Sequence, residues 1–139
     1  MAEVRMHANR NLRPRVLSSG ERRGIPNYVA FNDGQRPSWW AEFRYHHDGE
    51  LLGVIENTTG SGREAIVVTS EEMLVLEEPV VRRLRYDDIA SVGRLDKDPV
   101  SETIRVARKS GGTFELPVRG QTGAIGDVQR YLLCVAREF

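Results

Sequence analysis

The sequence predicts an α+β domain in which about seven short antiparallel strands are followed by one C-terminal helix and preceded by an N-terminal arm. Two observations carry this prediction: short β-rich runs separated by turn residues over 50–119, and a change from strand to helix periodicity after Gly120. A length of 139 residues fits a single folded domain. We therefore expect an arm over residues 1–37 and a domain over residues 38–139.

The N-terminal arm shows no sustained strand or helix periodicity and is interrupted by several glycines and prolines. Apolar residues at 28–31 predict that the arm docks on the domain as an additional strand. The arm is also locally positive, because its first 23 residues hold two glutamates against six arginines: Arg5, Arg10, Arg13, Arg15, Arg22 and Arg23.

Residues 38–47 fit either a helix or a strand. Ser38 is a suitable helix cap, and helical spacing would place Trp39, Trp40 and Phe43 on one side. Aromatic residues also favour strands. The spacing after the cap favours the helix.

The β-rich region begins with a strand at 50–56 and a flexible loop at 57–62. Further strands are expected at 65–69 and 73–76, which form a hairpin, and then at 81–86, 89–93, 103–107 and 113–119. After Gly120, apolar residues from Ile125 to Phe139 recur at helical spacing, which predicts an amphipathic helix. One core is expected to collect Ile66, Val68, Leu74, Leu76, Ile104, Val106, Phe114, Leu116, Leu132 and Val135.

Several of these segments resemble the bacterial pleckstrin-homology-like domain group, which is related to GRAM-type domains. The similar segments are residues 48–52, 66–69, 74–76, 85–92 and 112–118, before an amphipathic terminal helix. The resemblance covers about residues 48–139 and implies a seven-stranded partial barrel of two orthogonal sheets, closed at one end by the helix. It also implies a noncatalytic scaffold for lipid, peptide or protein binding, with homo-oligomers among the members.

Lipid-binding members of that group hold inositol phosphates with basic residues in and beside the loop between their first two strands. Here that loop, residues 57–62, is flanked by Arg63 alone. A single guanidinium cannot neutralise a multiply phosphorylated headgroup, so phosphoinositide recognition is not expected.

Two features are candidates for binding a protein partner or a second copy of the chain. Adjacent tryptophans, Trp39 and Trp40, cannot both face one core in a regular helix or strand, and exposed tryptophan is enriched at interfaces. The alternative is that both pack between arm and barrel. The second candidate is a basic cluster that could receive an acidic partner or remain a solvated face: Arg82, Arg83 and Arg85.

Nucleic-acid binding and hydrolase activity are the alternatives to protein binding, and the composition limits the first of them. Twenty basic and twenty acidic residues exclude a globally basic nucleic-acid binder, so nucleic-acid binding through Arg10, Arg13 and Arg15 of the arm is the alternative function. A small hydrolase around His46 and His47 is less favoured, because adjacent histidines seldom converge on one ion or substrate. We expect no enzyme activity, metal or cofactor.

The expected location is the bacterial cytoplasm. Cys134 is the single cysteine, which fits a reducing compartment, and no apolar run resembles a signal segment or is long enough to span a membrane. Eighteen arginines against two lysines are typical of a GC-rich bacterial genome. Cys134 itself is expected to be a buried or half-buried thiol of the helix and not a nucleophile.

Overall fold

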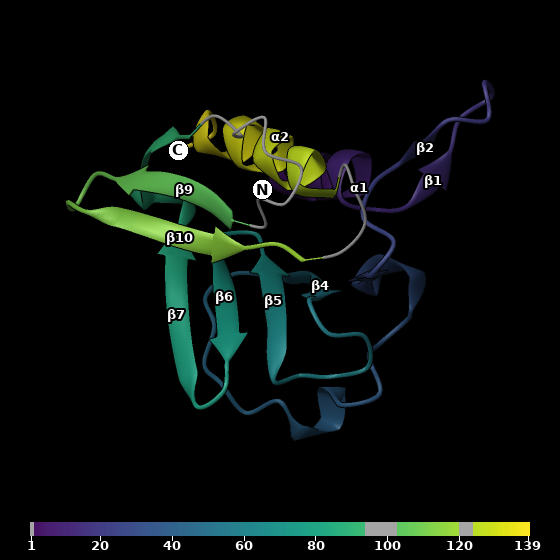
Figure 1. Cartoon of the computed structure of the whole chain (residues 1–139), viewed down its shortest axis with the longest axis horizontal. Helices are drawn as coiled ribbons and strands as arrows, with labels where there is room; N and C mark the ends of the chain where they lie inside the picture. The colour runs from purple at the N-terminus through teal and green to yellow at the C-terminus, as the bar shows by residue number, and fades with distance from the viewer. Residues whose placement is uncertain (1, 94–102, 120–123) are drawn as a thin grey trace.

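The computed structural model describes residues 2–93, 103–119 and 124–139. Within these ranges the chain forms two α-helices, three short 3-10 helices and ten strands, and every strand pairing is antiparallel. The expected α+β class with a C-terminal helix is confirmed (Figure 1). The described strands lie in three separate sheets and do not form a closed barrel.

The largest sheet has five strands, each of which pairs with the next one along the chain. Its first strand comes from the arm and pairs with β4, so the additional strand expected there is confirmed. The β5–β6 hairpin is also confirmed, with Thr69 Oγ1 accepting the backbone N–H groups of Glu71 and Glu72. The five strands are β3 (Tyr28–Ala30), β4 (Leu51–Glu56), β5 (Glu64–Thr69), β6 (Glu72–Glu77) and β7 (Val80–Arg85).

The second sheet has the strand order β10-β9-β8. A 3-10 turn, η3 (Tyr86–Asp88), leads from β7 into β8 (Ile89–Val92), and β9 (Thr103–Arg108) and β10 (Thr113–Pro117) follow. The two sheets and the helices enclose the main core, which includes Ile104 and Leu116 from the second sheet.

Two helices lie side by side over the sheets: α1 (Ala2–Asn11) and α2 (Ala124–Ala136) (Figure 1). The arm was expected to lack helical periodicity, and this expectation was wrong for the residues that form α1. Val4, Ala8 and Leu12 recur every four residues, and all three are buried in the main core. Ten residues with so few apolar anchors make a marginal helix in isolation, so the packing against α2 is what stabilises it.

The five-stranded sheet is buried on both faces, which divides the hydrophobic residues into two clusters. Met73 and Val75 belong to the main core, whereas Leu74 and Leu76 belong to a second cluster on the outer face. The expectation of a single core was therefore wrong for Leu74 and Leu76. A strand that is apolar on both faces has no alternation to indicate which face is inner.

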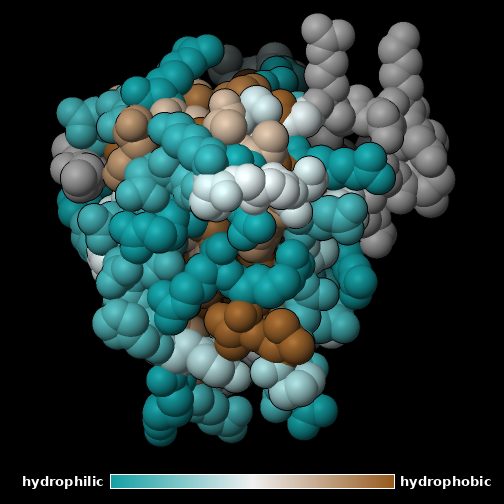
Figure 2. All heavy atoms as spheres, turned by 90° about the vertical axis from the view of Figure 1, so that its left-hand side faces the viewer, coloured by the Kyte–Doolittle hydropathy of each residue, from teal (hydrophilic) through white to brown (hydrophobic). Residues whose placement is uncertain are grey.

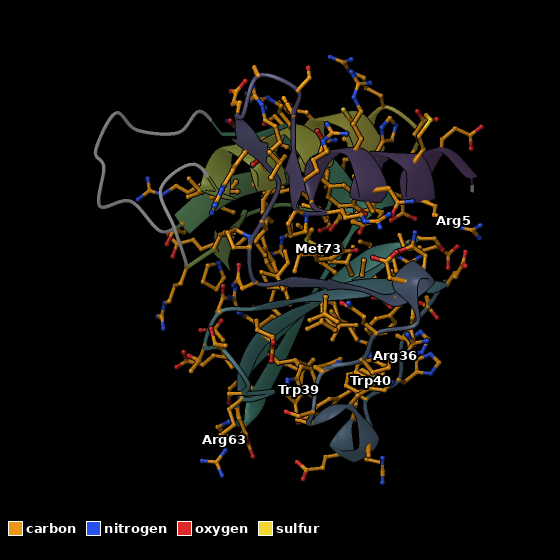
Figure 3. All side chains as sticks on the ribbon, turned by 90° about the vertical axis from the view of Figure 1, so that its right-hand side faces the viewer. Arg5, Arg36, Trp39, Trp40, Arg63 and Met73 are labelled. Atoms are coloured by element: carbon orange, nitrogen blue, oxygen red, sulfur yellow. The ribbon has the colours of Figure 1, made fainter. Side chains whose placement is uncertain are left out.

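Residues 38–47 form this outer layer and not the expected helix. Only a 3-10 turn, η2 (Trp40–Glu42), is present, and no side chain caps it. The ring of Trp40 stacks on Phe43 at 4.5 Å between centroids and meets the edge of Phe31, in η1 (Phe31–Asp33). In Figure 3, Trp39 and Trp40 lie on the opposite side of the strands from Met73 and α1. Burial of these aromatic rings against the outer face of the sheet outweighs the local preference of residues 38–47 for a helix.

A small hairpin of β1 (Arg15–Val16) and β2 (Arg22–Arg23) projects from the body beside the helices (Figure 1). Gly20, with a φ of +81°, closes its turn by donating its N–H to the carbonyl of Leu17. In the described ranges, neither α-helix has the length and apolar composition of a membrane-spanning segment.

Candidate functional site

The base of the β1–β2 hairpin is fixed against both helices by Gly24. This residue has a φ of +87°, and a Cβ there would lie 2.1 Å from the carbonyl oxygen of Arg13. Only glycine fits this close crossing. The N–H of Gly24 donates to Asp127 Oδ2 on α2 at 3.2 Å, and the next residue, Ile25, donates its N–H to the Leu12 carbonyl.

This crossing leaves an open cleft of about 460 Å³ between the two helices and the hairpin, which we call the arginine cleft. All three elements contribute arginine to its lining. The lining residues are Arg10 and Asn11 from α1, Arg15 and Arg23 from the hairpin, and Asp127, Arg130, Leu133, Cys134 and Arg137 from α2.

The α2 wall of the cleft is a second stripe on an amphipathic helix. Arg130, Leu133, Cys134 and Arg137 follow the spacing i, i+3, i+4, i+7, so they share one side of the helix.

The apolar stripe of α2 that was expected to face the core is confirmed for Val128, Leu132 and Val135, which are fully buried. Phe139 lies beyond the end of α2 and is partly exposed. Cys134 is half-buried, which agrees with the expected buried or half-buried thiol, and it lines the cleft.

Asp127 is the acidic residue in the lining, and both of its carboxylate oxygens already have partners within the chain. One carboxylate oxygen accepts the Gly24 N–H, and the other lies 3.4 Å from Arg130. Arg23 pairs with Glu21 at the side of the hairpin. The side chains of Arg10, Arg15 and Arg137 make no ion pair or hydrogen bond within the described residues.

The hairpin register adds repulsion to this charge. Arg15 stands directly opposite Arg23 in the antiparallel pair, and both line the cleft. Like charges in directly opposed positions destabilise a pair of strands. An anion between the two guanidinium groups would relieve that repulsion, so the local geometry favours a negatively charged ligand.

Two other arginines of the arm, Arg5 and Arg13, form ion pairs within the chain. Arg13, which was grouped with Arg10 and Arg15 as a nucleic-acid candidate, pairs with Asp33 at 2.9 Å and is absent from the cleft lining. Arg5 pairs with Glu50 at 2.5 Å. The structure thus brings Arg10 and Arg15 together and separates Arg13 from them.

The basic cluster on β7 is divided and paired. Arg82 packs over the Phe114 ring and pairs with Glu77, while Arg83 pairs with the fully buried carboxylate of Glu72. Arg85 lies 2.7 Å from Asp48, and its hydrogen bond holds the pKa of that carboxyl below its ordinary value. The same bond raises the pKa of Arg85. Figure 2 shows this side of the molecule, which is mostly hydrophilic with a small hydrophobic patch in its lower part.

Trp39 and Trp40 are both half-buried in the outer layer. Trp39 Nε1 donates to Glu56 Oε2 at 2.8 Å, which satisfies its polar group. A Cβ on Gly62 would lie 2.5 Å from the Trp39 ring, so the 57–62 loop closes tightly over it. A neighbouring pocket of about 350 Å³ is lined by Trp39, Phe43 and Tyr45.

The histidines do not form a metal cluster. His46 is 80% exposed and lies 3.3 Å from Asp48, whereas the His47 ring lies beside Phe43. His7 lies on α1, 3.4 Å from Glu138. In the described part of the chain, no three His, Cys, Asp or Glu side chains are grouped so that they could hold a metal ion.

Of the five cleft arginines, Arg23 was expected only as part of the positive charge of the arm, and Arg130 and Arg137 were not expected to take part in binding. The α2 pair was visible as a polar stripe at helical spacing, but its position beside the arm depends on the packing of α1, which was not expected. Comparison with protein-family models, curated proteins and solved structures finds no match to this chain.

Proposed function

We propose that this chain is a noncatalytic binding module on a pleckstrin-homology-like scaffold, and that it holds an anionic partner in the arginine cleft. The order of elements supports the scaffold: four consecutive strands, β4 to β7, then three more in a second sheet, and then α2. The helix α1 and strands β1 to β3 are additions outside the region of resemblance.

One observation carries the binding proposal: the cleft gathers five arginines, and three of them lack any partner among the described side chains. Guanidinium groups bind phosphate or carboxylate oxygens in pairs of parallel hydrogen bonds. Structural arginines in this protein are paired, as on β7. Unpaired arginines around a recess therefore fit ligand binding better than a structural role.

Assembly through Trp39 and Trp40 has less support. Both rings pack on the outer face of the sheet, and the indole N–H of Trp39 is bonded within the chain. Phosphoinositide binding at the 57–62 loop is equally unsupported, because Arg63 at its end lies 3.4 Å from Glu78.

Calorimetric titration with tripolyphosphate tests the proposed function. Wild-type protein should bind, and the double variant Arg10→Gln/Arg137→Gln should lose most of the heat. A matched control, Arg63→Gln/Arg105→Gln, removes the same charge from two highly exposed arginines outside the cleft and should bind like wild type. Equal binding by all three proteins, or no binding to any, would refute the cleft as the site. Release of inorganic phosphate during the titration would refute the noncatalytic assignment.

A further inference from the structure

The neutral net charge of the chain conceals a division between its ends and its middle. Residues 1–37 and 124–139, which carry the cleft, contain nine arginines and five acidic residues. Residues 38–123 contain eleven basic and fifteen acidic residues. The excess positive charge is therefore concentrated in the segments that form α1, the β1–β2 hairpin and α2, so a long polyanion would be attracted to that side.

The cleft arginines are spread along a path and do not converge on one point. Arg130 and Arg137 are seven residues apart on α2, which corresponds to about 10 Å along the helix axis. Across the cleft, the hairpin carries Arg15 and Arg23, and the hairpin projects away from the body (Figure 1). Arg22 on the hairpin is exposed and has no side-chain partner in the described ranges. This arrangement fits a repeating anion better than a single compact phosphate.

The hydrogen-bonding character of the lining distinguishes between repeating anions. An acidic peptide brings a backbone N–H with nearly every residue, and each needs an acceptor when it is buried. The side-chain acceptors in the lining belong to Asp127, which is occupied, and Asn11. A sugar–phosphate backbone presents mainly acceptor oxygens, which match a lining of guanidinium donors.

The lining also contains no aromatic side chain among the described residues. Bases of a single strand are usually held by stacking on aromatic rings or guanidinium planes. Without aromatic rings, the lining can offer bases only guanidinium planes, and neither such stacking nor contacts to the phosphates select a base sequence.

On these grounds we infer that the partner is a nucleic acid, held by its sugar–phosphate backbone in the arginine cleft and along the β1–β2 hairpin. This inference rests on the proposed function and names the chemistry of its partner. Contacts to three to five phosphates predict that the logarithm of the affinity falls with the logarithm of salt concentration. The slope should be about −3 to −4.5 for duplex DNA and about −2 to −3.5 for a single strand.

Fluorescence anisotropy with a labelled mixed-sequence DNA, single-stranded and duplex, at about 50 to about 200 mM salt tests the inference. Arg10→Gln/Arg137→Gln should weaken binding at least about tenfold and flatten the salt slope by about two. The control Arg63→Gln/Arg105→Gln should stay within about twofold of wild type. A scrambled DNA sequence should bind equally well. Circular dichroism of each variant should match wild type, and Arg22→Gln provides a milder second variant on the hairpin.

Three outcomes would overturn the inference. The first is equal weakening by the cleft variant and its control, which would indicate nonspecific attraction. The second is tighter binding of polyglutamate or of anionic phospholipid vesicles than of DNA. The third is no DNA binding by a protein that still binds tripolyphosphate in the cleft, which would leave the proposed function standing and remove only the nucleic acid. Failure of both ligands would refute the two proposals together.

Discussion

The arginines of β7 and the arginines of the cleft differ in what lies beside them. Each of Arg82, Arg83 and Arg85 has a carboxylate within ion-pair distance. In the cleft, Arg10 and Arg137 have no such partner in the described ranges, and Asp127 is shared between Gly24 and Arg130. A run of arginines in the sequence therefore indicates charge, but only the fold indicates which charge remains available to a ligand.

The presence or absence of an ion-pair partner also predicts which arginines contribute to stability and which contribute to ligand binding. Arg83 compensates a buried charge, so its removal should harm the fold. Arg10 and Arg137 are exposed and do not neutralise a buried carboxylate, so their substitution should weaken ligand binding without lowering stability.

Two adjacent leucines on α2 test the difference between the core side and the cleft side of the helix. Leu132 is fully buried, and Leu132→Ala should lower the free energy of unfolding by about 2–5 kcal/mol. Leu133 is 41% exposed in the cleft, and Leu133→Ala should cost less than about 1 kcal/mol. Urea denaturation measures both. Equal losses would mean that the cleft side of α2 is part of the folding core.

Two glycines of the hairpin test what holds the cleft together. Gly24→Ala combines an unfavourable positive φ with a clash against the Arg13 carbonyl, and should cost about 2–4 kcal/mol. Gly20→Ala has a similar φ but open space around it, and should cost about 1 kcal/mol. Thermal and urea denaturation would compare them. A Gly24→Ala protein as stable as Gly20→Ala would contradict the close crossing at the base of the cleft.

Arg83→Ala should destabilise the protein by about 1–3 kcal/mol. The Glu72 carboxylate has a side-chain exposure of 0%, and after the substitution only the Asp48 N–H would remain to bond it. The matched Arg137→Ala should change stability by less than about 0.5 kcal/mol. If the two variants were equally stable in urea, the contrast between paired and unpaired arginines would have no energetic basis.

The Asp48–Arg85 pair predicts a small effect that depends on pH. The Arg85 hydrogen bond lowers the folded-state pKa of Asp48 below 3.8, so its contribution to stability is present above pH 3.8. That contribution should disappear as the pH falls below 3.8 toward the folded-state pKa. The stability difference between wild type and Asp48→Asn should therefore be larger at about pH 5 than at about pH 3. A difference that grows on acidification would have the wrong sign.

The sequence predicted the regions in which local pattern and tertiary packing agree. Strands β9 and β10 alternate regularly, and their buried residues Ile104, Val106, Phe114 and Leu116 were all expected in the core. The helix α2 carries an apolar stripe at helical spacing, and Val128, Leu132 and Val135 of that stripe are fully buried. In these segments one face is buried and the other is solvated, so periodicity alone identifies the inner face.

The segments that were missed depend on contacts with distant parts of the chain. Helix α1 shows only three apolar anchors, and residues 38–47 are shaped by the sheet face that they cover. The same reason explains the candidate site. Arg10 and Arg15 were noticed as charge on an arm, but the cleft exists only because α1 and Gly24 bring that arm to α2.

An NMR titration of the arginine side chains tests directly whether an anion binds at the unpaired arginines of the cleft. Tripolyphosphate should shift the Nε–Hε signals of Arg10, Arg15 and Arg137 while those of Arg82, Arg83 and Arg85 stay in place. That result would locate the anion at the unpaired arginines. Shifts confined to the β7 arginines, with the cleft signals unchanged, would show that the cleft is not the anion site.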